Sequence, residues 1–206
     1  MQCAEASHGA PRLGAVVLAA GASRRFGSPK QMARFGDRSL LQHSLAAASA
    51  VAAEDVILVI GAHAAEIATS LPGDAVSIVV NRAWKEGIAS SIRTGVARLP
   101  AACEGALLLL ADQPLVVADS LQRLVDAWRS APQTIVAARY ANISGAPAIF
   151  PRWCFADLSR LSGDEGARSL LHRCADRVRH VELPEAAVDI DRPEDLIALQ
   201  AAREQS

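Results

Sequence analysis

The residues best suited to chemistry in this sequence form a loop of small and basic side chains near the N-terminus. The loop, LAAGASRRFGSPK at residues 18–30, follows an apolar, strand-like run. Small residues let the backbone approach a ligand closely, and its two glycines can adopt positive φ. Backbone N–H groups exposed in such a turn bind anionic oxygens. Arg24, Arg25 and Lys30 add positive charge, so we expect the loop to bind a nucleotide triphosphate.

Two well-known phosphate-binding patterns do not fit this loop. A Walker A loop requires G-x-x-x-x-G-K-[ST], whereas Gly21 and Gly27 are six residues apart and Lys30 is followed by Gln31. The dinucleotide pattern G-x-G-x-x-G is also missing, because Ser23 stands two residues after Gly21. The loop instead follows L-A-A-G-x-S-x-R-x-G-x-x-K, and a basic surface turn after a buried strand is the alternative interpretation.

A second candidate is an aspartate at the end of an aliphatic run. The run ALLLLA at residues 106–111 leads directly into Asp112, and an acid at the end of a buried strand is well placed to hold a metal. Magnesium prefers one or two carboxylates together with phosphate oxygens and water. A turn or helix-cap acid before Pro114 is the alternative, although Asp119 would cap the following helix more naturally. We therefore expect Asp112 to bind Mg²⁺, or Mn²⁺ in its place.

The segment VDIDRPED at residues 188–195 supplies further acids. Asp189 and Asp191 share one face if the segment is extended. Pro193 can begin a helix with acids in its first turn, so an acidic helix N-terminus is the alternative. One of the two aspartates could complete a metal site with Asp112, and we favour Asp191 over Asp189.

The segment NRAWKEGIASSIRTG at residues 81–95 combines a glycine with two serines at the start of a helix. Gly87 permits a close approach to a ligand. The hydroxyls of Ser90 and Ser91 either cap the helix or bond the edge of a nucleobase. Arg93 either reaches a phosphate or is solvated. The sequence leaves these alternatives open.

The C-terminal third contains the blocks ISGAPAIF at residues 143–150 and LSGDEGARSLL at residues 161–171. The second block places Arg168 on the first turn of a helix, and helix N-termini attract anions. Arg168 could therefore bind a phosphate through two hydrogen bonds. A capped helix with an internal aspartate–arginine pair is the alternative, and it is equally open.

Composition limits the classes of function. The 206 residues suit one domain, and the formal net charge of −1 with only 4% aromatic residues argues against nucleic-acid or anionic membrane partners. The four cysteines form no C-x-x-C pair, so we expect reduced thiols in a cytoplasmic protein. No apolar run approaches the roughly 18 residues that span a bilayer. Residues 1–12 are expected to be a flexible tail.

The elements that must position these motifs alternate between apolar runs and amphipathic segments, which predicts βαβ units around a mainly parallel sheet. Near-continuous aliphatic strands are typical of a sheet covered on both faces. The fold class is therefore α/β, a Rossmann-like three-layer sandwich, in one domain at residues 13–203. Ligands of such sheets bind beyond the carboxyl ends of the strands. The expected strands are 14–19, 56–60, 76–81, 106–111, 134–140, 146–150 and 179–182. The expected helices are 39–53, 64–71, 90–99, 118–130, 153–161, 165–174 and 193–203.

Together these blocks resemble the molybdenum cofactor cytidylyltransferases of the MobA-like nucleotidyltransferase superfamily. The resemblance runs from about residue 14 to residue 200 and rests on LAAGASRRFGSPK, NRAWKEGIASSIRTG, LADQP, GAPAIF, GDEGARSLL and DIDRPEDL. The guanylyl branch has LAGG where this chain has LAAG. The usual cytidylyl form has threonine before the proline of the last block, where this chain has Arg192.

The resemblance implies transfer of CMP from CTP to the molybdenum cofactor on a fold of the nucleotide-diphospho-sugar transferase type. The terminal phosphate of molybdopterin would attack the α-phosphorus of CTP, and pyrophosphate would leave. The product, molybdopterin cytosine dinucleotide, would serve hydroxylases of the xanthine dehydrogenase type. CTP, the molybdenum cofactor and a client molybdenum hydroxylase are the implied partners.

The resemblance also implies roles for particular residues. Arg25, Lys30 and Asp112 would be catalytic, and Mg²⁺ would bind Asp112 with Asp191 or Asp189. The implied nucleotide-binding residues are Leu18, Ala19, Ala20, Gly21, Ser23, Arg24, Gly87 and Ser91. The implied acceptor-binding residues are Gly145, Pro147, Gly163, Asp164 and Arg168.

Other functions stay open from the sequence. Another nucleotidyltransferase of this fold could use GTP with molybdopterin, or CTP with a sugar or alcohol phosphate. A carrier that delivers the cofactor to a hydroxylase without turnover is a different class. The presence of Arg25, Lys30, Asp112 and Asp191 argues against a carrier that has lost catalysis. A Rossmann dehydrogenase is the most distant alternative, because its glycine pattern is missing.

Overall fold

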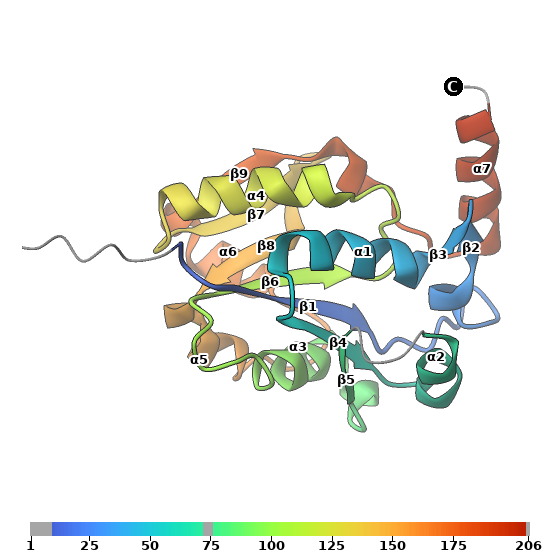
Figure 1. The fold of residues 1–206 in the computed structure, drawn as a ribbon, viewed down its shortest axis with the longest axis horizontal. Coiled ribbons are helices and arrows are strands. Elements are labelled where there is room, and N and C mark those ends of the chain that lie inside the picture. Colours follow the sequence, from blue (N-terminus) through green and yellow to red (C-terminus); the bar gives the residue numbers. More distant parts are fainter. Residues whose placement is uncertain (1–9, 72–75, 205–206) are drawn as a thin grey trace, which may run out of the picture.

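The centre of the molecule is a seven-stranded sheet (Figure 1). The structure is a computed structural model that describes residues 10–71 and 76–204. The strands lie in the order β5-β4-β1-β6-β8-β7-β9 across the sheet. Their bounds are Leu13–Ala19 for β1, Val56–Ile60 for β4, Ser77–Val80 for β5, Gly105–Leu110 for β6, Ile135–Tyr140 for β7, Ile143–Pro151 for β8 and Val178–Glu182 for β9. A separate hairpin pairs β2 (Arg34–Phe35) with β3 (Arg38–Ser39).

The sheet is mainly parallel, which confirms the predicted α/β class. Strand β1 pairs in parallel with β4 on one side and β6 on the other. Strand β8 runs antiparallel to its neighbours β6 and β7, and β7 pairs in parallel with β9. Every residue of β1 is buried. Its sequence LGAVVLA shows no alternation because both of its faces are covered.

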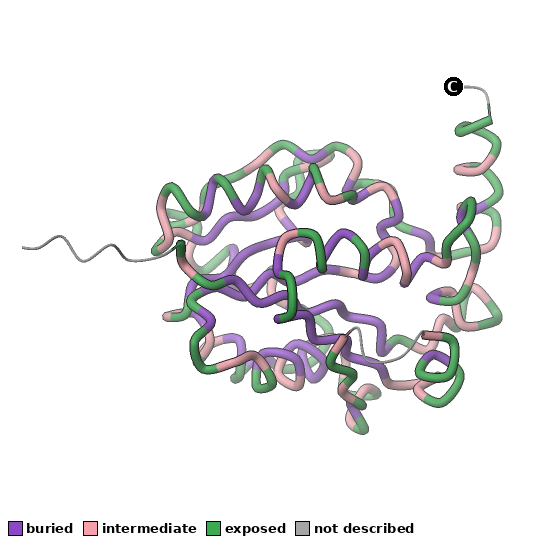
Figure 2. The backbone as a smooth tube through the Cα atoms, viewed as in Figure 1, coloured by how far each residue is buried: buried purple, intermediate pink, exposed green. Residues whose placement is uncertain are grey.

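Helices cover both faces of the sheet. Their bounds are Leu40–Ala52 for α1, Ala64–Ser70 for α2, Ile88–Val96 for α3, Ala118–Ser130 for α4, Phe155–Leu158 for α5, Arg168–Arg173 for α6 and Pro193–Glu204 for α7. Helices α1 and α4 lie on one face, and α3 and α5 lie on the other (Figure 1). Figure 2 shows the central strands buried between helices whose outer sides are exposed, whereas the edge strands β5 and β9 are largely exposed. None of the helices within the described ranges is long and apolar enough to cross a membrane.

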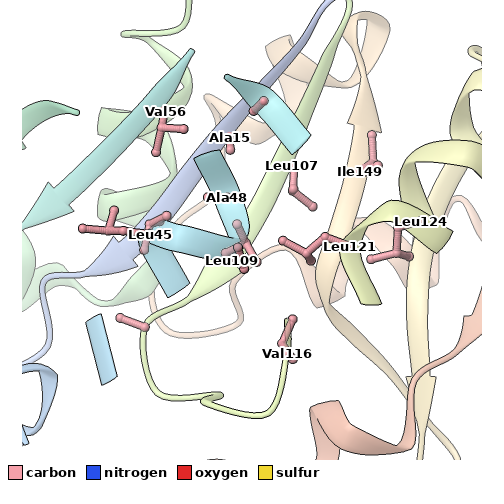
Figure 3. Packing of buried hydrophobic residues seen from close by; sticks show 14 of the residues in the cluster. Ala15, Leu45, Ala48, Val56, Leu107, Leu109, Val116, Leu121, Leu124 and Ile149 are labelled. Atoms are coloured by element: carbon pink, nitrogen blue, oxygen red, sulfur yellow. The ribbon is translucent and has the colours of Figure 1, made fainter. Parts of the chain in front are cut away.

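Alternate residues of the central strands β1, β4 and β6 contribute to two separate cores. Ala15 of β1 packs in a cluster with Leu45 of α1 and Leu121 of α4 (Figure 3). Val16, the next residue of β1, packs in the second cluster with Ile92 of α3. Both cores consist largely of aliphatic side chains and alanine. This packing fixes the carboxyl ends of β1 and β6 at the same edge of the sheet.

Most predicted elements are present with small shifts at their ends. The expected strand at residues 56–60 and the expected helix at residues 118–130 coincide with β4 and α4. The strand expected at residues 146–150 is longer, since β8 begins at Ile143. The sequence reasoning missed the β2–β3 hairpin, whose strands have only two residues each.

Two predicted helices are shorter than expected. The helix expected at residues 153–161 is a 3-10 turn, Arg152–Cys154, followed by the single turn of α5. The helix expected at residues 165–174 begins only at Arg168, as α6. The reason is local, because Gly163 and Gly166 adopt φ values of +65° and +58°. These left-handed conformations keep residues 163–167 out of a right-handed helix.

The expected tail at residues 1–12 falls mostly on residues 1–9, which lie outside the described residues. Arg12 directly precedes β1, and its Nη2 donates to Asp55 Oδ1 at 2.8 Å. The carbonyl oxygen of Arg12 accepts a hydrogen bond from the backbone N–H of Glu104 at 2.8 Å. The first strand is therefore anchored at its start.

A third, small apolar cluster connects the C-terminal segment to the rest of the molecule. It contains Phe35 of the β2–β3 hairpin, Leu40 of α1, Leu196 of α7 and Ile190. Ile190 is completely buried, and its backbone N–H donates to the carbonyl oxygen of Asp112 at 2.9 Å. The aspartates on either side of Ile190 are thereby carried to the carboxyl end of β6.

Candidate functional site

A cavity of about 630 Å³ lies where the carboxyl ends of β1 and β6 meet the start of α3. This is the edge of the sheet at which α/β proteins bind ligands. All eight residues expected to bind a nucleotide are in its wall, together with Arg25, Lys30, Asp112 and Asp191. Further wall residues are Ala22, Gln31, Trp84, Lys85, Ile88, Leu110, Ala111 and Asp164.

Lys30 joins the two expected metal ligands. Its Nζ lies 2.7 Å from Oδ2 of Asp112 and 2.9 Å from Oδ1 of Asp191. Nη2 of Arg25 lies 3.0 Å from the other oxygen of Asp191. Residues far apart in the sequence therefore form one compact cluster of two carboxylates and two cations.

Charge and burial both act on the ionisation of this cluster. The hydrogen bond from Lys30 lowers the pKa of Asp191, and the nearby charge of Arg25 lowers it further. Burial by itself would lower the pKa of Lys30, but the charges and hydrogen bonds of Asp112 and Asp191 raise it above its ordinary value. Burial raises the pKa of Asp189, and the charges of Asp112 and Asp191 add to this effect. The cluster thus keeps Lys30 charged and Asp191 ionised.

The donor set fits a divalent cation. Oδ1 of Asp112 is buried, and no group within residues 10–71 and 76–204 hydrogen-bonds to it. A buried carboxylate oxygen needs a partner to offset its lost hydration. Across the described chain, no three His, Cys, Asp or Glu side chains gather closely enough to hold a metal. Two carboxylates would then bind the cation together with phosphate oxygens, the arrangement that Mg²⁺ favours.

The two aspartates of the DID segment differ in position. Asp191 is in the cavity wall and contacts Lys30, whereas Asp189 is outside the wall. The segment is not a regular strand. The backbone N–H of Asp191 donates to Oδ2 of Asp195 at 2.9 Å, which turns the chain into α7. Of the two aspartates, Asp191 is the one that lies in the cavity wall beside Lys30.

The start of α3 forms another part of the cavity wall. Nδ2 of Asn81 donates to Oγ of Ser90 at 2.8 Å and to Oγ of Ser91 at 3.0 Å. Ser90 in turn donates to the carbonyl oxygen of Gly87 at 2.8 Å. Ser91, in contrast, lies in the wall of the cavity. Ser90 therefore bonds carbonyl oxygens of the preceding turn rather than capping α3, and Ser91 is the serine that lines the cavity.

The partly exposed Arg93 bonds other groups of the protein. Its Nη1 donates to the carbonyl oxygen of Leu161 at 2.6 Å, and its Nη2 donates to Oε2 of Glu86 at 2.8 Å. It is absent from the wall of the cavity. Arg93 therefore ties the loop after α5 to α3.

Gly87 is required where the loop at residues 162–167 meets the start of α3. Its φ is +101°, and a Cβ there would overlap Oδ1 of Asp164 and lie 2.5 Å from the carbonyl oxygen of Gly163. That carbonyl oxygen accepts a hydrogen bond from the backbone N–H of Ala89 at 3.2 Å. Gly163 thus packs on α3 and places Asp164 at the cavity.

A second cavity of about 680 Å³ adjoins the first. The two share Leu18, Ile88, Leu110 and Asp164. The other apolar residues of its wall are Ile92, Leu108, Ala146, Ala148, Phe150, Ala167 and Leu171. Its polar and glycine positions are Tyr140, Gly145, Glu165, Gly166, Arg168, Ser169 and His172. The second cavity therefore combines an apolar surface with one arginine and two carboxylates, those of Asp164 and Glu165.

Three of the five expected acceptor residues, Gly145, Asp164 and Arg168, line this second cavity. A Cβ on Gly145 would lie 2.9 Å from the hydroxyl oxygen of Tyr140 and 3.8 Å from Nη2 of Arg168. Pro147 is buried and does not line the cavity. Its neighbours Ala146 and Ala148 do line the cavity, at a point where the pairing of β8 with β7 shifts register.

Several wall residues received no role from the sequence. Trp84 and Lys85 were part of a quoted motif, and Lys85 Nζ lies 5.5 Å from the centre of the Trp84 ring. In the sequence, Gln31 only distinguishes the basic loop from a Walker A pattern. Tyr140 and His172 lie in segments without a local motif. Two features of the sequence point to such residues. Gln31 directly follows Lys30, and Tyr140 is the only tyrosine of the chain.

Comparisons with known proteins agree with this geometry. Residues 15–181 match the family described as MobA-like NTP transferase domain. Nicotine blue oxidoreductase from Paenarthrobacter nicotinovorans is 30% identical over 172 residues, 79% of this chain and 83% of that protein. The purine catabolism protein PucB from Bacillus subtilis is 31% identical over 169 residues, 78% of this chain and 81% of that protein.

Solved structures show the same fold over nearly the whole chain. The structure of Rv0371c from Mycobacterium tuberculosis H37Rv is 32% identical, with a TM-score of 0.81, and the match covers 94% of this chain and 100% of that one. Another structure of Rv0371c is a complex with manganese, with 30% identity, a TM-score of 0.77 and coverage of 93% and 99%. With most of its length matched by the family and its cavity lined by the expected nucleotide-binding residues, the chain belongs to the MobA-like NTP transferases.

Proposed function

We propose that this protein transfers CMP from CTP to the molybdenum cofactor and releases pyrophosphate, forming molybdopterin cytosine dinucleotide. The observation that carries the proposal is the pair of adjoining cavities with a common wall. One cavity holds the basic loop and the acidic pair, which suit a nucleotide triphosphate with a cation. The other joins apolar surface to Arg168, which suits a ring system that carries a phosphate.

The residues of the first cavity would act by position and charge. Arg25 and Lys30 would bind the triphosphate, and they would stabilise the negative charge that develops on the leaving pyrophosphate. Ser91 would bond the edge of the base. The common wall would hold the acceptor phosphate close to the α-phosphorus, so that both reactants are oriented before reaction. Phosphoryl-group transfer depends mainly on such positioning and charge stabilisation.

Asp112 and Asp191 would hold the divalent cation, Mg²⁺ or Mn²⁺. When bound, the cation would supply Lewis-acid polarisation of the α-phosphate. Oδ1 of Asp112, which has no hydrogen-bond partner among the described residues, and the manganese in a structure of Rv0371c support this assignment.

The choice of CTP over GTP rests on the segment Leu18-Ala19-Ala20-Gly21. All four residues are in the wall of the first cavity. The sequence resembles the cytidylyl form LAAG rather than the guanylyl form LAGG. The client would be a molybdenum hydroxylase that uses the cytosine dinucleotide.

The decisive experiment measures pyrophosphate release from CTP, GTP and ATP with Mg²⁺ or Mn²⁺ and the molybdenum cofactor as acceptor. We expect release that depends on the acceptor and is selective for CTP. The variant Asp112→Asn should abolish it. The matched control is Asp126→Asn, whose carboxylate accepts from Gln122 on the exposed side of α4, and it should retain the wild-type rate.

Other outcomes would change the assignment in defined ways. Selective release from GTP would make the protein a guanylyltransferase. Release with a sugar phosphate or an alcohol phosphate but not with the molybdenum cofactor would replace the acceptor. Folded protein that binds the molybdenum cofactor but turns over none of the three nucleotides would support the carrier function instead.

A further inference from the structure

Gln31 is a buried polar residue that connects three points of the basic loop. Its side chain lies in a 3-10 turn directly after Lys30, and the residue is only 3% exposed. Nε2 donates to the carbonyl oxygens of Ala19 and Gly21, both at 3.1 Å. Oε1 accepts from the hydroxyl of Ser23 at 3.2 Å. A single amide thus satisfies two acceptors and one donor.

These bonds account for the residue type at this position. A primary amide carries two N–H donors and one carbonyl acceptor on the same group. Glutamate has the same shape, but its carboxylate would face two carbonyl oxygens and has no donor when ionised. Methionine has a similar length and would leave both carbonyl oxygens and the Ser23 hydroxyl without their partner.

The four consecutive backbone carbonyl oxygens of residues 19–22 all have hydrogen-bonding partners within the protein itself. Besides the two bonds from Gln31, the carbonyl oxygen of Ala20 accepts from the backbone N–H of Ala62 at 3.1 Å. The carbonyl oxygen of Ala22 lies 3.3 Å from Nε2 of His63, which donates when that nitrogen is protonated. Carbonyl oxygens repel phosphate, so engaging them elsewhere leaves the N–H groups and basic side chains to meet an anion.

Gln31 also supports the strained turn that carries the two arginines. Ser23 has a φ of +50°, in the left-handed region that costs energy for a residue with a side chain. Its hydroxyl donates to Gln31 and accepts from the backbone N–H of Lys30 at 3.2 Å. Arg24 and Arg25 follow directly in the turn. The amide therefore holds the backbone of the turn from which the two arginines project.

We propose that Gln31 is a positioning residue for the nucleotide triphosphate. By holding the carbonyl oxygens of Ala19 and Gly21 and the hydroxyl of Ser23, it keeps the loop in the one arrangement that presents donors to the phosphates. The inference rests on the proposed nucleotide-binding role of the first cavity. Gln31 would thus be an uncharged functional residue next to the charged ones of the basic loop.

The test compares the variants Gln31→Met and Gln42→Met. Calorimetric titration of each protein with CTP in the presence of Mn²⁺ gives the Kd, steady-state kinetics give the KM values, and thermal unfolding gives the Tm. Gln42 is a matched control because its side chain accepts from the backbone N–H of Ser39 in the capping box of α1. We expect Gln31→Met to raise both Kd and KM for CTP by at least about tenfold. The KM for the acceptor should stay at the wild-type value. Gln42→Met should lower Tm and leave all three constants unchanged.

Ser23→Ala provides a second variant in case Gln31→Met does not fold. It removes one of the three bonds of Gln31, so we expect Kd for CTP to rise by about threefold. In the double variant the two effects should combine to less than their product, because Ser23 and Gln31 share a hydrogen bond. Wild-type CTP affinity in Gln31→Met or Ser23→Ala would overturn the inference and leave the residues purely structural. Absence of CTP binding by the wild-type protein would instead overturn the proposed function, and this inference with it.

Discussion

Lys30 contacts the same two carboxylates that the proposed cation would use. It bonds Oδ2 of Asp112, while Oδ1 of that residue is left for a second partner. Lys30 and a divalent metal ion can therefore bind different oxygens of the Asp112 carboxylate at the same time. Asp191 has both oxygens engaged, one with Lys30 and the other with Arg25. These cations would have to turn partly toward the triphosphate before Asp191 could bind the metal.

We predict that Lys30→Gln lowers kcat for nucleotidyl transfer by about 10²–10³-fold, because a charge that stabilises the transition state is removed. The same change should raise the pKa of Asp191, since the hydrogen bond from Lys30 is the main cause of its lowered value. The control Lys85→Gln changes a lysine of the same cavity that contacts Trp84 rather than the acidic pair. Equal rates for the two variants would contradict the role given to Lys30.

At the scale of elements, the site depends on how closely α3 approaches the sheet. Gly95 of α3 faces Val16 of β1 and Val59 of β4. A Cβ on Gly95 would overlap Cγ1 of Val16 and lie 2.9 Å from Cγ2 of Val59. The small residue lets α3 lie close to the strands, and this places Gly87 and Ser91 at the cavity.

We predict that Gly95→Ala destabilises the protein by about 1–3 kcal/mol through overpacking. In an exposed helix the same substitution would stabilise by roughly 0.5–1 kcal/mol, so the sign of the effect reports the close contact. Urea unfolding measures it. A variant that is more stable than wild type would show that α3 can move away from the sheet without cost.

A second prediction at this scale concerns the anchor between Arg12 and β4. The hydrogen bond from Arg12 lowers the pKa of Asp55 below its ordinary value of 3.8. A lowered pKa in the folded state means that the stabilisation is fully present above about pH 4 and is lost as the pH falls through the folded-state value. We expect Asp55→Asn to lower Tm by about 2–4 °C at pH 7. The difference from wild type should shrink toward zero below pH 4, and a difference that does not depend on pH would argue against the ion pair.

At the scale of the whole molecule, one edge of the sheet provides both cavities. The first lies over the ends of β1 and β6, and the second extends along β6 and β8 toward α6. The antiparallel strand β8 contributes Gly145, Ala146, Ala148 and Phe150 to the second cavity. Both substrates could therefore be bound together, with their reacting groups meeting at the common wall.

We predict that initial rates measured at varied CTP and acceptor concentrations give intersecting double-reciprocal lines. Simultaneous binding in adjoining cavities requires a sequential mechanism with both substrates present. Parallel lines would indicate a covalent nucleotidyl-enzyme intermediate, as in ping-pong kinetics. Such a result would contradict the arrangement proposed for the two cavities.

The amino-acid sequence by itself determined the class of fold and placed the basic loop and Asp112 at the carboxyl edge of the sheet. The aliphatic runs of β1, β4 and β6 show the continuous hydrophobicity of strands covered on both faces. The motif at residues 18–30 and Asp112 follow such runs directly, so their position at the carboxyl edge follows from the element pattern. The order of these runs and motifs along the sequence was sufficient for both conclusions.

Only the tertiary structure decided which side chains meet. Asp191 rather than Asp189 contacts Lys30 across 161 positions of sequence, because buried Ile190 anchors the segment to Asp112. Arg93 bonds the carbonyl oxygen of Leu161, which lies 68 positions away. The hydrogen bonds of Gln31 to Ala19, Gly21 and Ser23 also became visible only in the structure. Periodicity predicts which faces are buried, but hydrogen bonds between distant segments depend on how the elements pack, and that information is not local to any motif.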